Sequence, residues 1–187
     1  MGDSIVLDPY DIYQMNKHLG VKFEELLNHK ISLHAEEGLI LPNLKMQGKE
    51  DGCAFLNEKG RCTIHAFRPG FCRLFPLGRI YEDGSFSYYL QSQECTKANR
   101  TKVKVNKWLG IPDLKQYENF VNEWHYFLKD TKALLLRLSD AQLNQELSMY
   151  LLNRFYTTAF DLEIDFYKQF DERMIQMKKL VYTLGRQ

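Results

Sequence analysis

All four cysteines of this 187-residue chain lie in its middle, in the pattern Cys53-x8-Cys62-x9-Cys72-x22-Cys95. Cysteines that served only as small core residues would be scattered over the apolar faces of the chain. These four instead fall where the regular apolar pattern is weakest, so something other than apolar packing is expected to hold this segment together. Thiolate coordination is one solution, because a single metal centre replaces many buried contacts. The sequence therefore predicts a metal or metal-cluster site formed by the four cysteines.

Two other roles for the cysteines stay open. They could be structural buried thiols, or one of them could be a redox or nucleophilic thiol. The chain has no Cys-x-x-Cys pair, so it lacks both the tight knuckle of zinc ribbons and a dithiol redox motif. His65 could replace one cysteine as a ligand, since it follows Cys62 by three residues, but a partly exposed histidine on a strand is the simpler interpretation.

The cysteine segment is basic. Residues 53–80 carry five cations and one acid, a local balance of 5 − 1 = +4: Lys59, Arg61, Arg68, Arg73 and Arg79 against Glu58. Cationic neighbours lower the pKa of a thiol and favour the thiolate, which is the form that binds metals. Arg68 and Arg73 are the candidates for offsetting the negative charge of a metal centre and donating hydrogen bonds to its sulfurs.

The backbone around Cys72 is expected to be irregular, because Pro69, Gly70 and Pro76 surround it. Its N–H groups would then be available to point at sulfur. Soft thiolates suit both an iron–sulfur cluster and a zinc ion. The long cysteine spacings lack the compactness of a zinc ribbon, and arginines lie nearby. Both features slightly favour an iron–sulfur cluster over a zinc ion.

The N-terminal and middle parts predict short helices followed by strands and loops. Asp8 and Pro9 are typical of a helix start, Gly20 is typical of a helix end, and a second helix is predicted over residues 22–30. Further on, Asp83-Gly84 separates two short apolar pieces and predicts a β-hairpin.

The last third of the chain predicts amphipathic helices, which begin at Pro112, at Ser139-Asp140 and at about Phe160. Their apolar faces are interpreted as core, with a groove for a protein partner left open. The fold class is therefore α+β and mostly α-helical. We expect residues 1–110 to form a cysteine-cluster metal-binding domain, and residues 111–187 to form a helical region packed on it.

Three sequence elements occur in a fixed order around the cysteines: C-x-F-L from Cys53, G-x-C-x-I around Cys62, and R-P-x-x-C-R-x-F-P around Cys72. In these elements the chain resembles the YkgJ-type cysteine-cluster family. The resemblance is firm over about residues 50–80 and weaker out to Cys95. It implies a domain that chelates zinc or iron.

The family resemblance also raises two further expectations. Members carry a C-x-x-C-x-x-C-C motif ahead of a segment like residues 3–13. This sequence has the segment but lacks the motif, so we expect that the chain starts at an internal methionine or was trimmed. Flagellin lysine N-methylases contain a similar domain, which makes a protein lysine N-methyltransferase-like enzyme the alternative function. No Gly-x-Gly motif of the dinucleotide type accompanies it.

Composition and sequence patterns narrow the remaining classes of function and location. A formal net charge of +1 argues against a broad nucleic-acid footprint. A second basic run precedes Trp108 and is interpreted as a solvated helix face: Lys97, Arg100, Lys102, Lys104 and Lys107. No run of 18 apolar residues is present, so a membrane span is not expected. Without an export signal we expect a cytoplasmic protein, where disulfides are disfavoured.

Overall fold

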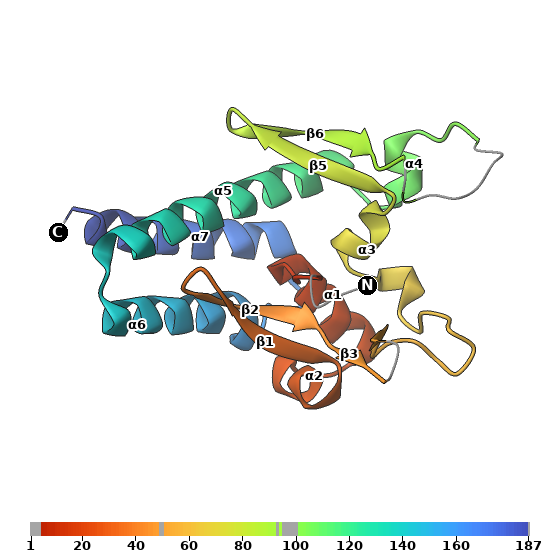
Figure 1. Ribbon diagram of the computed structural model, residues 1–187, viewed down its shortest axis with the longest axis horizontal. Helices are drawn as coiled ribbons and strands as arrows, with labels where there is room; N and C mark the ends of the chain where they lie inside the picture. The colour runs from red at the N-terminus through yellow and green to blue at the C-terminus, as the bar shows by residue number, and fades with distance from the viewer. Residues whose placement is uncertain (1–4, 49–50, 93, 95–100, 187) are drawn as a thin grey trace.

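The computed structural model describes residues 5–48, 51–92, 94 and 101–186, so Cys95 lies outside the described residues. Helices make up most of the regular structure, and the strands pair in three small antiparallel sheets (Figure 1). The predicted class, α+β and mostly α-helical, is confirmed. Among the described residues, no helix is long and apolar enough to cross a membrane.

The two N-terminal helices form where the sequence predicts them. Helix α1 spans Pro9–Leu19 and α2 spans Phe23–His29. Asp8 accepts a hydrogen bond from the Asp11 N–H, and the Asp11 side chain accepts one from the Asp8 N–H, so the first turn of α1 has both bonds of a capping box. Gly20 ends the helix with a φ of 67°, a left-handed conformation that glycine adopts without a steric penalty.

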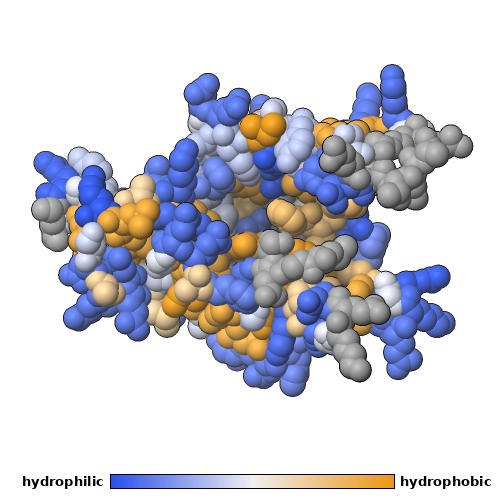
Figure 2. Space-filling view, in the orientation of Figure 1, coloured by the Kyte–Doolittle hydropathy of each residue, from blue (hydrophilic) through white to orange (hydrophobic). Residues whose placement is uncertain are grey.

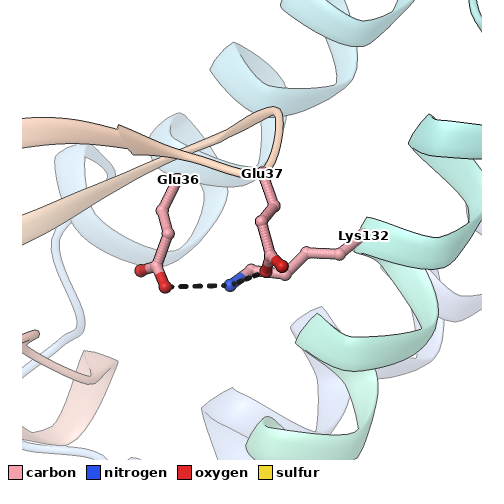
Figure 3. Close-up of polar contacts among 3 residues, drawn as sticks. All are labelled: Glu36, Glu37 and Lys132. Atoms are coloured by element: carbon pink, nitrogen blue, oxygen red, sulfur yellow. Dashed lines mark ion pairs between the residues drawn. The ribbon is translucent and has the colours of Figure 1, made fainter.

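A β-hairpin follows, formed by β1 (Ile31–Glu36) and β2 (Leu39–Leu44). Strand β2 is almost wholly buried and packs on helix α6 (Ala141–Leu152), where the Ile40 N–H donates to the Ser148 hydroxyl at 2.7 Å. The tip of the hairpin reaches helix α5 (Leu114–Leu138). There Lys132 Nζ lies 2.8 Å from the Glu37 carboxylate and 3.5 Å from that of Glu36 (Figure 3). The hairpin thus joins the N-terminal part to the C-terminal helices.

Short elements make up the middle of the chain. Strands β3 (Met46–Gln47) and β4 (Gly52–Cys53) pair, and the 3₁₀ helix η1 (His65–Phe67) and helix α3 (Gly70–Leu74) follow. Strands β5 (Leu77–Glu82) and β6 (Ser85–Leu90) form the hairpin predicted at Asp83-Gly84. Both turn residues have positive φ, as a two-residue hairpin turn of this hand requires. Helix α4 (Val105–Leu109) completes this part.

Three long helices and one π-helical turn end the chain: α5 (Leu114–Leu138), α6 (Ala141–Leu152), η2 (Asn153–Thr157) and α7 (Phe166–Leu184). Figure 1 shows α5 and α7 side by side, and the two helices are in contact. The predicted starts of α5 and α6 are confirmed. The predicted start of the last helix at about Phe160 is wrong, because α7 begins at Phe166, after Asp165 caps it by accepting from the Lys168 N–H.

The hydrophobic core draws on every part of the chain. Buried side chains from the N-terminal, middle and C-terminal elements form one cluster, which includes Leu7, Phe55, Ile64, Trp124 and Phe170. The Tyr156 hydroxyl, inside this core, donates to the Leu7 carbonyl at 2.9 Å, across 149 residues of sequence. Residues on both sides of position 110 contribute to the same core. The division of the chain into two domains at residue 110 stays a prediction.

Candidate metal centre

The three described cysteines come from three different elements. Cys53 ends β4 and pairs with Met46, Cys62 forms an isolated bridge with Leu56, and Cys72 lies in the middle of α3. Each carries a free thiol and is partly buried. The fourth predicted ligand, Cys95, lies outside the described residues.

A folded loop brings the chain from Cys53 back to Cys62. The Asn57 carboxamide oxygen accepts from the N–H groups of Lys59 and Arg61, both at 3.0 Å. These are side-chain-to-backbone bonds of the kind that close tight turns. The loop is then fixed to the core, because Phe55 of the first sequence element and Ile64 of the second are buried, whereas Leu56 of the first element is 41% exposed.

The positions of Phe55 and Ile64 explain two of the sequence elements in physical terms. The Thr63 N–H donates to the Phe55 carbonyl at 2.8 Å, so the two arms of the loop are also joined to each other. Each buried residue lies two positions after a cysteine. Anchoring them fixes the depth at which the two thiols lie.

Helix α3 holds Cys72 by a contact that the sequence did not reveal. The Gly70 N–H donates to the Asp11 carboxylate at 2.8 Å in a buried position. A Cβ on Gly70 would lie 1.9 Å from the Tyr117 hydroxyl oxygen, so only glycine fits there. The expectation of irregular backbone around Cys72 is wrong, because Gly70–Leu74 is helical, and the Gly70 N–H is directed to a carboxylate and not to sulfur.

The thiols of Cys53 and Cys62 act electrostatically on that of Cys72, and the thiol of Cys62 also acts on that of Cys53. Burial raises the pKa of Cys72 to about 12, with further contributions from the Asp11 carboxylate and from the other two thiols. Burial also raises the pKa of Cys53, with a contribution from Cys62. The three sulfurs therefore share one neighbourhood. Within the described ranges, however, no group of three His, Cys, Asp or Glu side chains is arranged to hold a metal ion.

The expectation that cationic neighbours lower the thiol pKa values is wrong for Cys53 and Cys72. Arg68 and Lys30 do act in that direction, on Cys72 and Cys53 respectively, but burial outweighs them. Lys30 lies close because its ammonium donates to the Ala54 carbonyl at 2.7 Å. A local charge balance counted along the sequence ignores desolvation, which is the larger effect at these thiols.

The two predicted arginines occupy different positions. Arg68 acts on Cys72, and its guanidinium contacts the ring of His65. Arg73 donates from Nε, Nη1 and Nη2 to three backbone carbonyls, those of Arg68, Leu109 and Ala66. The pKa of Arg73 is lowered by burial and by the charge of Arg68. Of the two, only Arg68 acts on a described thiol.

His65 lies on η1 and not on a strand, so that part of its interpretation is wrong. Its side chain is exposed, and its ring contacts the Arg68 guanidinium. The exposed position agrees with the simpler interpretation of this histidine.

Sequence reasoning missed a cluster of buried polar groups behind α3: Asp8, Asp11, Arg79 and Tyr117. Burial raises the pKa of Asp11 to about 6 and that of Asp8 well above its usual range. The Arg79 guanidinium lies 3.4 Å from the Tyr117 hydroxyl and over the Tyr117 ring. The Asp8-x-x-Asp11 capping spacing was visible in the sequence, but its second role at Gly70 depends on a contact 59 residues away.

A match to the family described as "CxxCxxCC: Putative zinc- or iron-chelating domain" covers residues 3–107. The chain belongs to this family of cysteine-cluster proteins. No curated protein matches the chain, and no solved structure matches it. The family therefore supports metal chelation in general and leaves the metal and its ligands to be argued from the residues.

Proposed function

We propose that the protein binds an iron–sulfur cluster or a zinc ion through Cys53, Cys62, Cys72 and Cys95. The observation that supports this proposal is the electrostatic action of Cys53 and Cys62 on Cys72, although the three residues come from a strand, a loop and a helix. Thiol donors in a partly buried setting suit soft or borderline metals. Membership in a zinc- or iron-chelating family supports the same conclusion.

Arg68 is the residue that we propose to stand beside this centre and offset its charge, because its own charge acts on Cys72. A four-thiolate zinc site and an oxidised four-iron cluster with four thiolates are both negatively charged. A guanidinium beside the site would offset part of that charge. Arg73, the other arginine predicted for this role, uses its donors on carbonyls and would support the centre by holding α3 against Leu109.

Elemental analysis and visible absorption of protein purified without oxygen test the proposal. A brown sample that contains iron and sulfide would identify a cluster, and a colourless sample with one tightly held zinc ion would identify the other metal. Cys62→Ser should lose the metal, whereas His65→Gln should keep it. Metal-free protein from preparations supplied with both metals would count against the whole proposal.

The methyltransferase alternative makes a separate prediction. An enzyme of this kind must bind its methyl donor, and a bound ligand raises the melting temperature. A thermal-shift series with S-adenosylmethionine therefore decides it without knowledge of the acceptor protein. We rank this alternative second, because no described feature of the chain favours it over metal binding.

A further inference from the structure

A cavity of about 610 Å³ lies beside the cysteine segment, between α1, the η1–α3 segment and the residues that lead into α7. Figure 2 shows that this face of the molecule is hollowed near its centre, in the region where Figure 1 places α1 and α3. A volume in this range suits a small organic molecule. None of the three described cysteines lines the cavity, which shares only Arg68 with the residues proposed for the metal centre.

Two arginines line the cavity without carboxylate partners. Within residues 5–48, 51–92, 94 and 101–186, neither Arg68 nor Arg73 takes part in an ion pair. The Nε of Arg68 is buried and has no hydrogen-bond partner in the described part of the chain. Each terminal nitrogen of Arg73 uses one N–H on a carbonyl and carries a second N–H. Both guanidiniums therefore keep donors for an anion.

Among the described residues, no acidic side chain that lines the cavity forms an ion pair with these arginines, although the charge of Asp11 acts on Arg73. Asp11 accepts a backbone N–H on each of its two oxygens, from Asp8 and from Gly70. Asp165 caps α7 by accepting from the Lys168 N–H at 2.9 Å. Glu163 is exposed, and solvent screens its charge. The two arginines thus keep unused hydrogen-bond donors at the cavity.

Aromatic rings form much of the remaining wall. The rings of Tyr10 and Tyr167 stack, with centroids 5.6 Å apart and an interplanar angle of 18°. The Phe67 ring stacks on His18 at 4.7 Å. All four residues line the cavity. Such a wall favours a flat ring that carries a polar group.

We propose that this cavity binds a small aromatic anion, with its ring against the tyrosine and phenylalanine side chains and its carboxylate or phosphate group at Arg68 and Arg73. Planar guanidiniums recognise both anionic groups through paired hydrogen bonds. The ring of the ligand supplies apolar contact area, and its carboxylate or phosphate group fixes its orientation. Metal binding at the cysteines is not required for this recognition.

Titration calorimetry with three probes of similar size tests the proposal: benzoate, phenyl phosphate and benzylamine. Benzoate or phenyl phosphate should bind at millimolar concentration, and the stronger of the two identifies the anionic group. Benzylamine has the same ring with the opposite charge and should not bind. Failure of both anions to bind, or equal binding of benzylamine, would overturn the proposal. These measurements use the unaltered protein, so they do not depend on the folding of a variant.

Arg68→Gln then locates the site. It should weaken binding of the preferred anion by about tenfold or more, as expected when a charged hydrogen-bond donor is removed. Arg61→Gln removes the same charge from an exposed residue of the same segment that does not line the cavity, and it should leave the affinity unchanged. Equal weakening by both variants would show attraction by net charge alone and would refute the assigned site. Metal content measured on the same samples separates this result from any failure of the metal centre.

Discussion

The Asp11 carboxylate accepts a hydrogen bond from the Gly70 N–H at 2.8 Å, and this bond joins α1 to the helix that carries Cys72. The same carboxylate accepts the Asp8 N–H, so one side chain both caps α1 and fixes α3. Tyr117, from α5, closes the other side of Gly70. The position of Cys72 therefore depends on residues far from the cysteine segment in sequence.

Gly70→Ala tests how closely α3 is held. The added Cβ would lie 1.9 Å from the Tyr117 hydroxyl oxygen, so either α3 or the tyrosine must shift. We expect a loss of about 1–3 kcal/mol in the free energy of unfolding, the usual cost of overpacking a well-filled site. Urea denaturation of the purified variant measures it.

Two further variants show whether that clash is the cause. Gly52→Ala is the matched control, because its Cβ would meet only ordinary contacts at 3.7 Å or more, and it should change stability by less than about 1 kcal/mol. Tyr117→Phe removes the clashing oxygen, so the double variant with Gly70→Ala should be more stable than the sum of the single effects. Strict additivity would contradict the proposed contact.

The buried Asp8–Asp11 pair predicts that stability falls as the pH rises. Burial raises the pKa of Asp11 to about 6, above its value in the unfolded chain, so the folded state binds more protons in this range. The stabilisation is complete below the unfolded pKa of about 4 and is lost as the pH rises through about 6. Asp8, whose pKa is raised in the same direction, adds to the effect. Urea denaturation across this range should show a loss on the order of 1–3 kcal/mol.

Asp11→Asn tests the origin of this dependence. The amide cannot ionise, so the slope of stability against pH should become smaller, although one of the two backbone bonds to the side chain is lost. Asp140→Asn is the control, because Asp140 caps α6 by the same kind of bond but is exposed. If Asp140→Asn reduced the slope of stability against pH as much as Asp11→Asn does, the buried pair would not be the origin of this slope.

Local patterns predicted helices α1, α2, α5 and α6 and the β5–β6 hairpin, because capping residues, helical spacing and an Asp-Gly turn act over a few residues. The helix at Cys72 was missed for the opposite reason. Gly70–Leu74 has only five residues, and a helix that short is stabilised by tertiary contacts such as the one with Asp11 and not by propensity.

In the candidate site, too, some features follow from local sequence and others depend on tertiary contacts. The cysteine spacing and the three sequence elements made Cys53, Cys62 and Cys72 the predicted ligands, which stays a prediction, and the anchoring of Phe55 and Ile64 gives two of those elements a physical reason. The pKa shifts of the thiols could not be predicted, because they depend on burial, and a sequence does not state how deeply a loop lies. The cavity beside Arg68 depends on the approach of α7, more than 90 residues away, and no local signal reports it.

Cys72→Ser should remove metal and lower stability together. If the cysteines hold a structural metal, we expect loss of the bound metal and a cost of several kcal/mol, because metal binding energy is also folding energy. A merely buried thiol would cost about 1–3 kcal/mol and leave the metal content unchanged. Elemental analysis and urea denaturation of the same sample distinguish the two results. Treatment of the unaltered protein with a chelator should reproduce the loss, and a chelator without effect on a metal-loaded sample would contradict a structural role.

Lys132 should contribute measurably to the attachment of the β1–β2 hairpin. Its side chain is only 18% exposed and faces two carboxylates, those of Glu36 and Glu37 (Figure 3). Lys132→Met should cost about 0.5–1 kcal/mol, the upper part of the range for pairs near the surface, and less at high salt. Lys178→Met is the matched control, because the Lys178–Glu123 pair is more exposed on its lysine side. An equal effect of both variants, independent of salt, would contradict the electrostatic account.

Arg173 should be one of the most sensitive positions in the C-terminal part. Its guanidinium donates to the carbonyls of Arg154, Thr158 and Ala159, at 2.7–2.8 Å, and lies 3.7 Å from the Phe160 ring centroid.

Those three carbonyls belong to the π-helical turn and the loop after it, so one side chain replaces the backbone partners that a continuing helix would supply. Arg173→Met keeps much of the packing but removes three partly buried hydrogen bonds, and it should cost about 1–3 kcal/mol. Arg173→Lys keeps the charge without the planar fork and should recover only part of this loss. Hydrogen exchange measures the local consequence: amides of residues 153–160 should exchange faster in both variants, and unchanged exchange there would show that the turn holds without the arginine.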